Sequence, residues 1–194
     1  LVSVATFSSN IQFWRTNGYF STPSELKPLL HTWSLAIEEQ YYLLFPPFLM
    51  LVWRSGKRGV AVWLGFLLIL SLLVAEWGAR YKPVAAFYLL PTRGFELLLG
   101  AMGALLLREW ESKARGAAGS FLGAAGLALV AASVLLLHEE VPLPGFNSLA
   151  PTLGAFLVIV FAHRDTYAGA LLSAPPFVGT GLISYSLYLW HQPL

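Results

Sequence analysis

The chain has 194 residues, of which 57% are hydrophobic, 14% aromatic and 11% charged. An average soluble domain carries about 25% charged residues, because much of its surface must face water. This composition therefore indicates a membrane protein and excludes a disordered chain. The net charge of +2 does not favour nucleic acid as a partner, and the absence of cysteine excludes thiolate metal sites and disulfides.

Apolar stretches along the chain predict the fold class. A membrane-spanning helix needs about 20 mostly apolar residues. The sequence predicts an all-α, polytopic membrane helix bundle with about six full spans and one partial span, forming a single membrane-embedded domain over residues 1–194 of a longer protein. The partial span is Leu1–Trp14, and the full spans are Trp33–Trp53, Val60–Trp77, Val84–Leu107, Ala117–Leu137, Asn147–Ala162 and Pro176–Leu194. The Ala/Gly-rich segment Gly116–Ala132 predicts close helix packing.

The connections between these spans alternate in basicity. Connections 54–59, 108–116 and 163–175 carry seven Lys and Arg residues, whereas 15–32, 78–83 and 138–146 carry four. Cytoplasmic loops are enriched in Lys and Arg, so the first set is predicted to be cytoplasmic.

Ionisable residues inside apolar spans are the main functional signal, since each costs on the order of 2.5–3.5 kcal/mol at a helix centre. The first group lies in residues 31–42. At 3.6 residues per turn one helix face would carry His31, Ser34, Glu38, Tyr42 and Phe45. Glu39 lies about 100° away from Glu38. Pro46 and Pro47 predict an interruption of this helix.

Two further groups follow. Arg93 and Glu96 are three residues apart and can pair on one helix face, which continues through Gly100 and Gly103. Ser184, Tyr188 and His191 share a face near the end of the chain.

The predicted orientation places all three groups of polar residues in the outer half of the bilayer or near its midplane. Because helices that are separated in sequence place these groups at compatible depths, we expect them to line one cavity. Two other interpretations remain open. Glu38 and Glu39 can serve as structural ion-pair partners of basic residues such as Arg93, and His191 can serve as an interfacial anchor.

The motifs at these positions resemble a known family. HTWSLAIEEQYYLLFP (31–46), TRGFELLLGA (92–101) and SYSLYLWHQP (184–193) resemble, in order, three motifs of the acyltransferase-3 family of bacterial integral-membrane O-acyltransferases, and NIQFWRTNGYF (10–20) also matches. The resemblance implies about ten membrane helices in the bacterial cytoplasmic membrane. It also implies transfer of an acyl group, typically acetyl, from cytoplasmic acyl-CoA to an extracytoplasmic carbohydrate such as O-antigen, peptidoglycan or exopolysaccharide.

The resemblance also implies that the family's main candidate base, a first-helix histidine, lies outside these residues. The fragment is therefore expected to be inactive alone, and the full protein can carry an extracytoplasmic domain. Supporting or orienting roles in catalysis are expected for His31, Glu38, Glu39, Arg93 and Glu96. Substrate contacts are expected for Ser34, Tyr42, Tyr188 and His191. Acyl-CoA is expected as a co-substrate, and no metal is expected. Arg54, Lys57 and Arg58 could attract the phosphates of acyl-CoA, although such residues usually serve only as positive-inside anchors.

Two alternatives use the same residues differently. A transporter or flippase also places charges near the midplane, although the sequence shows neither repeat symmetry nor paired broken segments. In a structural or regulatory membrane subunit, the polar groups would only hold the helices together.

Overall fold

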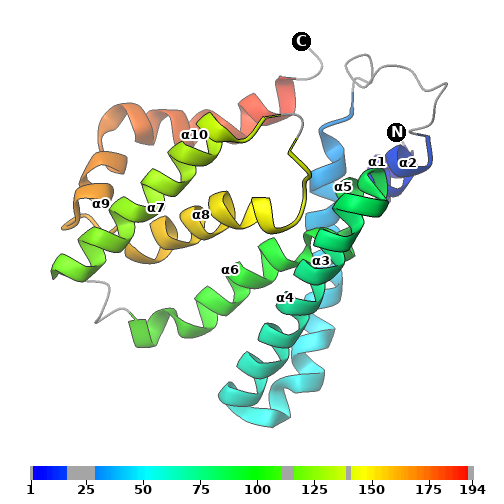
Figure 1. The fold of residues 1–194 in the computed structure, drawn as a ribbon, viewed down its shortest axis with the longest axis horizontal. Coiled ribbons are helices and arrows are strands. Elements are labelled where there is room, and N and C mark those ends of the chain that lie inside the picture. Colours follow the sequence, from blue (N-terminus) through cyan, green and yellow to red (C-terminus); the bar gives the residue numbers. More distant parts are fainter. Residues whose placement is uncertain (1, 17–28, 111–115, 139–140, 192–194) are drawn as a thin grey trace.

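The computed structural model describes residues 2–16, 29–110, 116–138 and 141–191, without the side chains of 106–110 (Figure 1). Within these ranges the regular elements are helices, which confirms the predicted all-α class. The α-helices are α1 (Val2–Ala5), α2 (Ser9–Thr16), α3 (Thr32–Val52), α4 (Gly56–Tyr81), α5 (Pro83–Tyr88), α6 (Leu90–Trp110), α7 (Gly116–Leu136), α8 (Leu149–Phe161), α9 (Tyr167–Leu172) and α10 (Pro175–Trp190). Two short 3₁₀ turns are η2 (Trp53–Ser55) and η3 (Phe146–Ser148).

The long apolar stretches form helices close to their predicted bounds, but the amino-terminal segment differs. The predicted partial span Leu1–Trp14 is divided into α1 and α2, with Phe7 at a φ of 52° between them. The backbone turns there because the Ser8 N–H bonds to the carbonyl of Ser3, five residues back, at 2.8 Å. This turn allows Asn10 of α2 to be fully buried.

The predicted interruption at Pro46 and Pro47 is wrong, because α3 continues through both residues. The fixed φ of proline is compatible with a helix, and each proline removes a single backbone hydrogen bond. Phe45 and Phe48 pack beside the prolines against a core of Val60, Leu64 and Leu98, so α3, α4 and α6 share one apolar interior.

The helices form two groups. Figure 1 shows α3, α4 and α5 in one half of the view and α7 to α10 in the other, with α6 running from the first to the second. In the second group α7 and α8 cross at Gly126 and Gly154, where the backbone of each glycine lies against the other. This crossing agrees with the predicted close packing of Gly116–Ala132.

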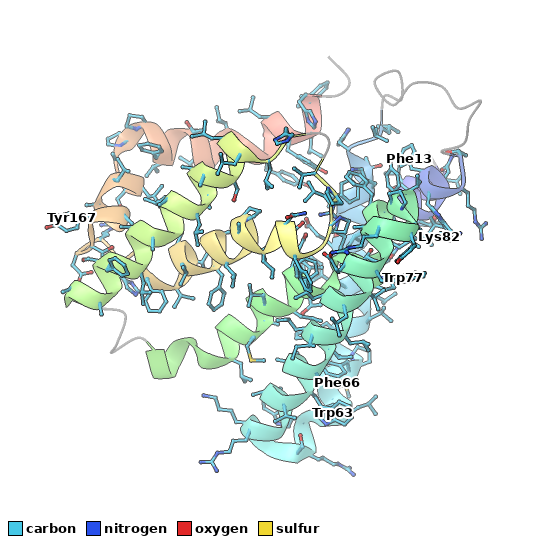
Figure 2. All side chains as sticks on the ribbon, in the orientation of Figure 1. Phe13, Trp63, Phe66, Trp77, Lys82 and Tyr167 are labelled. Carbon is cyan, nitrogen blue, oxygen red and sulfur yellow. The ribbon has the colours of Figure 1, made fainter. Side chains whose placement is uncertain are left out.

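The outer surface of α4 is strongly apolar. Figure 2 labels Trp63, Phe66 and Trp77 along α4, and each of these side chains is about half exposed. Three helical stretches of the described residues, Thr32–Tyr81, Pro83–Leu105 and Gly116–Leu136, are long and apolar enough to cross a membrane. These features fit a membrane helix bundle, and the number of crossings stays a prediction.

Candidate functional site

The predicted span Val84–Leu107 is broken at Leu89, and this break organises the site. Leu89 is extended, with φ −101° and ψ 143°, and separates α5 from α6. In a continuous helix the carbonyl of Phe87 would accept the N–H of residue 91, but residue 91 is proline and has none. The break therefore leaves the last carbonyls of α5 without helical partners.

Side chains cap these carbonyls. The hydroxyl of Thr92 donates to the carbonyl of Ala86 at 2.6 Å, and Nε of Arg93 donates to that of Phe87 at 3.3 Å. The carbonyl of Tyr88 accepts the side-chain amide of Asn10 at 3.0 Å. The break thus fixes Arg93 in place through its Nε.

Ser71 of α4 closes the first turn of α6. Its hydroxyl accepts the N–H of Phe95 at 2.8 Å and donates to the carbonyl of Pro91 at 2.7 Å. The Ser71 hydroxyl bonds to both backbone groups, so α4 holds the turn that carries Arg93.

Arg93 pairs within its own helix. Its Nη1 donates to Oε1 of Glu96 at 3.0 Å, as the spacing of three residues predicts. The guanidinium carbon lies 5.4 Å from the ring of Trp33 and 5.1 Å from that of Phe87, both within cation–π range. The side chain of Arg93 is only 16% exposed, so this cation is held in one direction.

Glu38 faces this pair across a hollow of about 90 Å³ between α3 and α6. Trp33, Ser34, Arg93 and Glu96 line the same hollow. Glu39 does not line it, in agreement with its predicted direction. Among the described residues Arg93 forms its ion pair with Glu96. The alternative pairing of Arg93 with Glu38 or Glu39 is therefore not observed there.

The end of α10 docks on the start of α3. The Tyr188 hydroxyl donates to the backbone carbonyl of His31 and lies 2.5 Å from the hydroxyl of Ser34. Tyr188 has one proton to donate, so the Ser34 hydroxyl is the donor to Tyr188. These bonds bring together residues 154 and 157 positions apart in the sequence.

His31 and His191 lie side by side at this contact, with ring centroids 5.6 Å apart. His31 is 7% exposed, and among the described residues its Nδ1 has no hydrogen-bond partner. Burial and the neighbouring His191 lower the pKa of His31, which precedes the apolar stretch beginning at Thr32. Nδ1 of His191 lies 2.6 Å from the carbonyl of Tyr188, which can only accept, so Nδ1 is the donor in this bond.

Three hollows share walls and form a series. A hollow of about 190 Å³, lined by His31, Tyr188 and His191, shares Trp33 and Ser34 with the hollow at Glu38. That hollow shares Arg93 and Glu96 with a hollow of about 630 Å³ between α6 and α8. The structure thus places seven of the predicted residues around three adjacent hollows: His31, Ser34, Glu38, Arg93, Glu96, Tyr188 and His191.

The remaining predicted residues lie elsewhere. Tyr42 is 58% exposed on the outside of α3. Arg54, Lys57 and Arg58 are exposed at the turn from α3 to α4, where Arg54 borders a separate hollow of about 550 Å³. The predicted connection 54–59 is shorter than expected, because α4 already begins at Gly56.

Sequence reasoning did not assign roles to Asn10, Gln40, Ser71 or Glu76. The side-chain amides of Asn10 and Gln40 bond to each other, at 2.8 Å from Gln40 Nε2 to Asn10 Oδ1, and so fasten α2 to α3. The one sequence feature that could have indicated such roles is that these polar residues lie within apolar segments. Within the described part of the chain, no group of three or more His, Cys, Asp or Glu residues could hold a metal ion.

Comparison with known proteins agrees with this arrangement of motifs. The family model described as an acyltransferase domain matches residues 1–194. YrhL of Bacillus subtilis, named provisionally as a peptidoglycan O-acetyltransferase, is 31% identical over 91% of this chain and 30% of its own length. The peptidoglycan O-acetyltransferase OatA of Listeria monocytogenes is 28% identical over 99% of this chain and 33% of its own length. The O-acetyltransferase OatA of Staphylococcus aureus is 28% identical over the whole chain and 34% of its own length.

The chain thus spans about a third of the length of these relatives. No solved structure matches it. The family match covers the broken helix that carries Arg93, the start of α3 and the end of α10. The chain belongs to the acyltransferase-3 family of acyltransferase domains.

Proposed function

We propose that this chain is the membrane-embedded domain of an O-acyltransferase in the bacterial cytoplasmic membrane. The donor is acyl-CoA on the cytoplasmic side, and the acyl group, most simply acetyl, goes to a hydroxyl of an extracytoplasmic carbohydrate. Family membership supports acyl transfer, and the names of the relatives make peptidoglycan the first acceptor to test. O-antigen and exopolysaccharide are further candidate acceptors.

The reaction sets clear chemical demands. The acceptor oxygen attacks the thioester carbonyl, a C–O bond forms, and the C–S bond breaks to release the coenzyme A thiol. The hydroxyl proton goes to a base, and negative charge develops on the carbonyl oxygen. A suitable site therefore combines a fixed cation with proton-accepting groups in a space that is partly shielded from water.

In the proposal Arg93 stabilises this developing charge, and Glu96 orients it. The guanidinium is anchored at Nε by the Phe87 carbonyl and at Nη1 by Glu96. These two bonds use two of the five N–H groups of the guanidinium, which leaves donors that can point at a substrate oxygen. Removing a single donor of this type typically lowers kcat by about 100- to 1,000-fold.

Glu38, His31 and His191 are proposed to orient the acceptor and assist its deprotonation. Glu38 lines the hollow beside Arg93, and the two imidazoles line the next hollow. Ser34 is shared by both hollows, so a sugar hydroxyl could bond to it from either side.

The donor is proposed to approach from the other end of α3. Arg54, Lys57 and Arg58 attract its phosphates there, and 21 helical residues separate this end from His31. At 1.5 Å per residue this distance is about 31 Å, close to the thickness of the hydrocarbon core. The thioester end of acyl-CoA would therefore have to extend through the domain to meet the acceptor at the hollows.

The observation that carries the proposal is the series of adjacent hollows lined by Glu38, Arg93 and His31. The test uses the full-length parent protein in membrane vesicles supplied with radiolabelled acetyl-CoA and peptidoglycan fragments. We expect Arg93→Ala to reduce label transfer about 100-fold or more at unchanged protein level. Arg164→Ala, which removes an exposed arginine far along the chain, is the matched control.

A transporter remains the second candidate, because the break at Leu89 is a feature that transporters use at their binding sites. The same vesicles distinguish the two functions. A glycan that crosses the bilayer without acquiring label would refute acyl transfer and support transport.

A further inference from the structure

The largest of these three adjacent hollows lies where the two helix groups meet. Arg93 and Glu96 of α6 form one part of its wall, and Thr152 and Phe156 of α8 form another. A third part comes from the connection between α7 and α8, and its described residues 141–148 are here called the strap. Leu143 and Ser148 of the strap line the hollow.

One carboxylate ties the strap to the first helix group. Oε2 of Glu76, near the end of α4, accepts the backbone N–H of Phe146 at 2.9 Å. Its other oxygen, Oε1, accepts Nε of Arg80 at 2.8 Å and Nη2 at 2.5 Å. Each oxygen therefore has a separate function, since one holds the strap and the other is itself held by Arg80.

The side chain of Glu76 is 18% exposed, whereas that of Arg80 is 65% exposed. A little-exposed carboxylate forms a stronger hydrogen bond than one screened by water. Arg80 thus acts from the surface to hold the partly buried carboxylate in position.

The strap is shaped to fit this carboxylate. Gly145 has a φ of +154°, and a Cβ atom there would lie 2.6 Å from Oε2 of Glu76. Within the strap the Ser148 N–H donates to the carbonyl of Gly145 at 3.0 Å, and Asn147 donates to that of Pro142 at 3.2 Å. The strap therefore has internal bonds of its own and is fastened to α4 at Phe146.

We propose that Glu76 is a positioning residue that holds the strap against the hollow beside Arg93 and Glu96. This inference rests on the proposed function. The connection 138–146 carries no Lys or Arg and is predicted to face the outside, so the substrate affected is the extracytoplasmic carbohydrate acceptor. When the strap is held for a smaller fraction of the time, the apparent KM for the acceptor rises by the same factor.

Steady-state kinetics of the full-length protein in membrane vesicles test this proposal. We expect Glu76→Ala to raise the acceptor KM about tenfold while the KM for acetyl-CoA is unchanged, since loss of a hydrogen bond to a charged group is of this size. Glu76→Gln keeps an oxygen for the Phe146 N–H and should restore most of the acceptor KM. Asp165→Ala, at an exposed carboxylate in another connection, is the matched control.

A labelling experiment tests the tether without relying on activity. Phe146→Cys keeps the backbone N–H and places a thiol at a side chain that is 49% exposed. A membrane-impermeant maleimide should label this thiol faster when Glu76→Ala is also present, and at the original rate with Glu76→Gln.

The outcomes separate the two proposals. If the parent protein transfers acyl groups and Glu76→Ala changes neither the acceptor KM nor the labelling rate, the role of Glu76 is refuted and the proposed function stands. A fall in kcat and protein level with both KM values unchanged would show a purely structural role and would also refute it. If the parent protein transfers no acyl group, the proposed function fails, and with it the role of Glu76 in the reaction.

Discussion

Replacing Gly126 by alanine tests how the second helix group is held together. A Cβ atom at Gly126 would lie 2.8 Å from the carbonyl oxygen of Gly154 and 3.0 Å from the backbone nitrogen of Val158. Both atoms belong to the backbone of α8, so they cannot rotate away as a side chain would. The substitution must therefore push α8 away from α7.

Two effects of the substitution oppose each other. Overpacking in a close-packed interior typically costs about 1–3 kcal/mol. Alanine instead of glycine in a helix interior recovers up to about 1 kcal/mol. Because the contacts at Gly126 are with backbone, overpacking should dominate, and we expect Gly126→Ala to lower the free energy of unfolding by about 1–2 kcal/mol.

Thermal unfolding of the detergent-solubilised full-length protein measures this difference. Gly179→Ala is the matched control, since Gly179 also lies within a helix but a Cβ atom there would meet nothing within 4 Å. The reasoning is refuted if Gly126→Ala is as stable as Gly179→Ala. Gly154→Ala should destabilise similarly, and the double variant should lose less than the sum because the helices have already separated.

Three further predictions concern the site. Tyr188→Phe removes the hydroxyl that bonds to His31 and Ser34, so the end of α10 should become more accessible to protease and acyl transfer should fall; Tyr185→Phe, 62% exposed on the same helix, should change neither. Ser71→Ala removes the hydroxyl that bonds to the N–H of Phe95 and the carbonyl of Pro91, which should lower the free energy of unfolding by about 1–3 kcal/mol. A variant as stable as the wild type would contradict the bridging role of Ser71. Burial and His191 lower the pKa of His31 below its ordinary value of 6.5, so the unfolded chain binds a proton at higher pH than the folded chain does. The free energy of unfolding should therefore fall as the pH drops through 6.5, and His31→Gln should weaken this pH dependence.

Much of the helical framework could be predicted from apolar stretches alone. Predicted spans Trp33–Trp53, Ala117–Leu137 and Asn147–Ala162 agree closely with α3, α7 and α8, because a long apolar run in a membrane protein must satisfy its backbone within a helix. The short helix α9 was missed because it lies in a connection and lacks a span-length apolar run.

Proline had opposite effects at two positions, and hydropathy does not distinguish them. Before Pro91 the carbonyls freed from the helix meet Thr92, Arg93 and Asn10, which cap them, and the helix breaks at Leu89. Around Pro46 the neighbours that pack on α3 are apolar, and the helix continues. The outcome depends on side chains that are distant in sequence, such as Asn10.

The candidate site was predictable where its residues share a helix or a motif. Arg93 and Glu96 pair as their spacing suggests, and His31, Ser34 and Glu38 lie along one side of α3. The bond from Glu76 to Phe146 joins residues 70 positions apart, so no local pattern could indicate it.

The break at Leu89 has a consequence for how the domain meets bilayers of different thickness. Proline has no amide hydrogen, so the carbonyl of Phe87 cannot gain a helical partner from residue 91 at any lipid composition or temperature. A continuous helix adapts to a thicker or thinner membrane by tilting as a unit. Here a change in tilt can be absorbed at Leu89, and the arginine, fastened to the carbonyl of Phe87, can keep its height relative to α3.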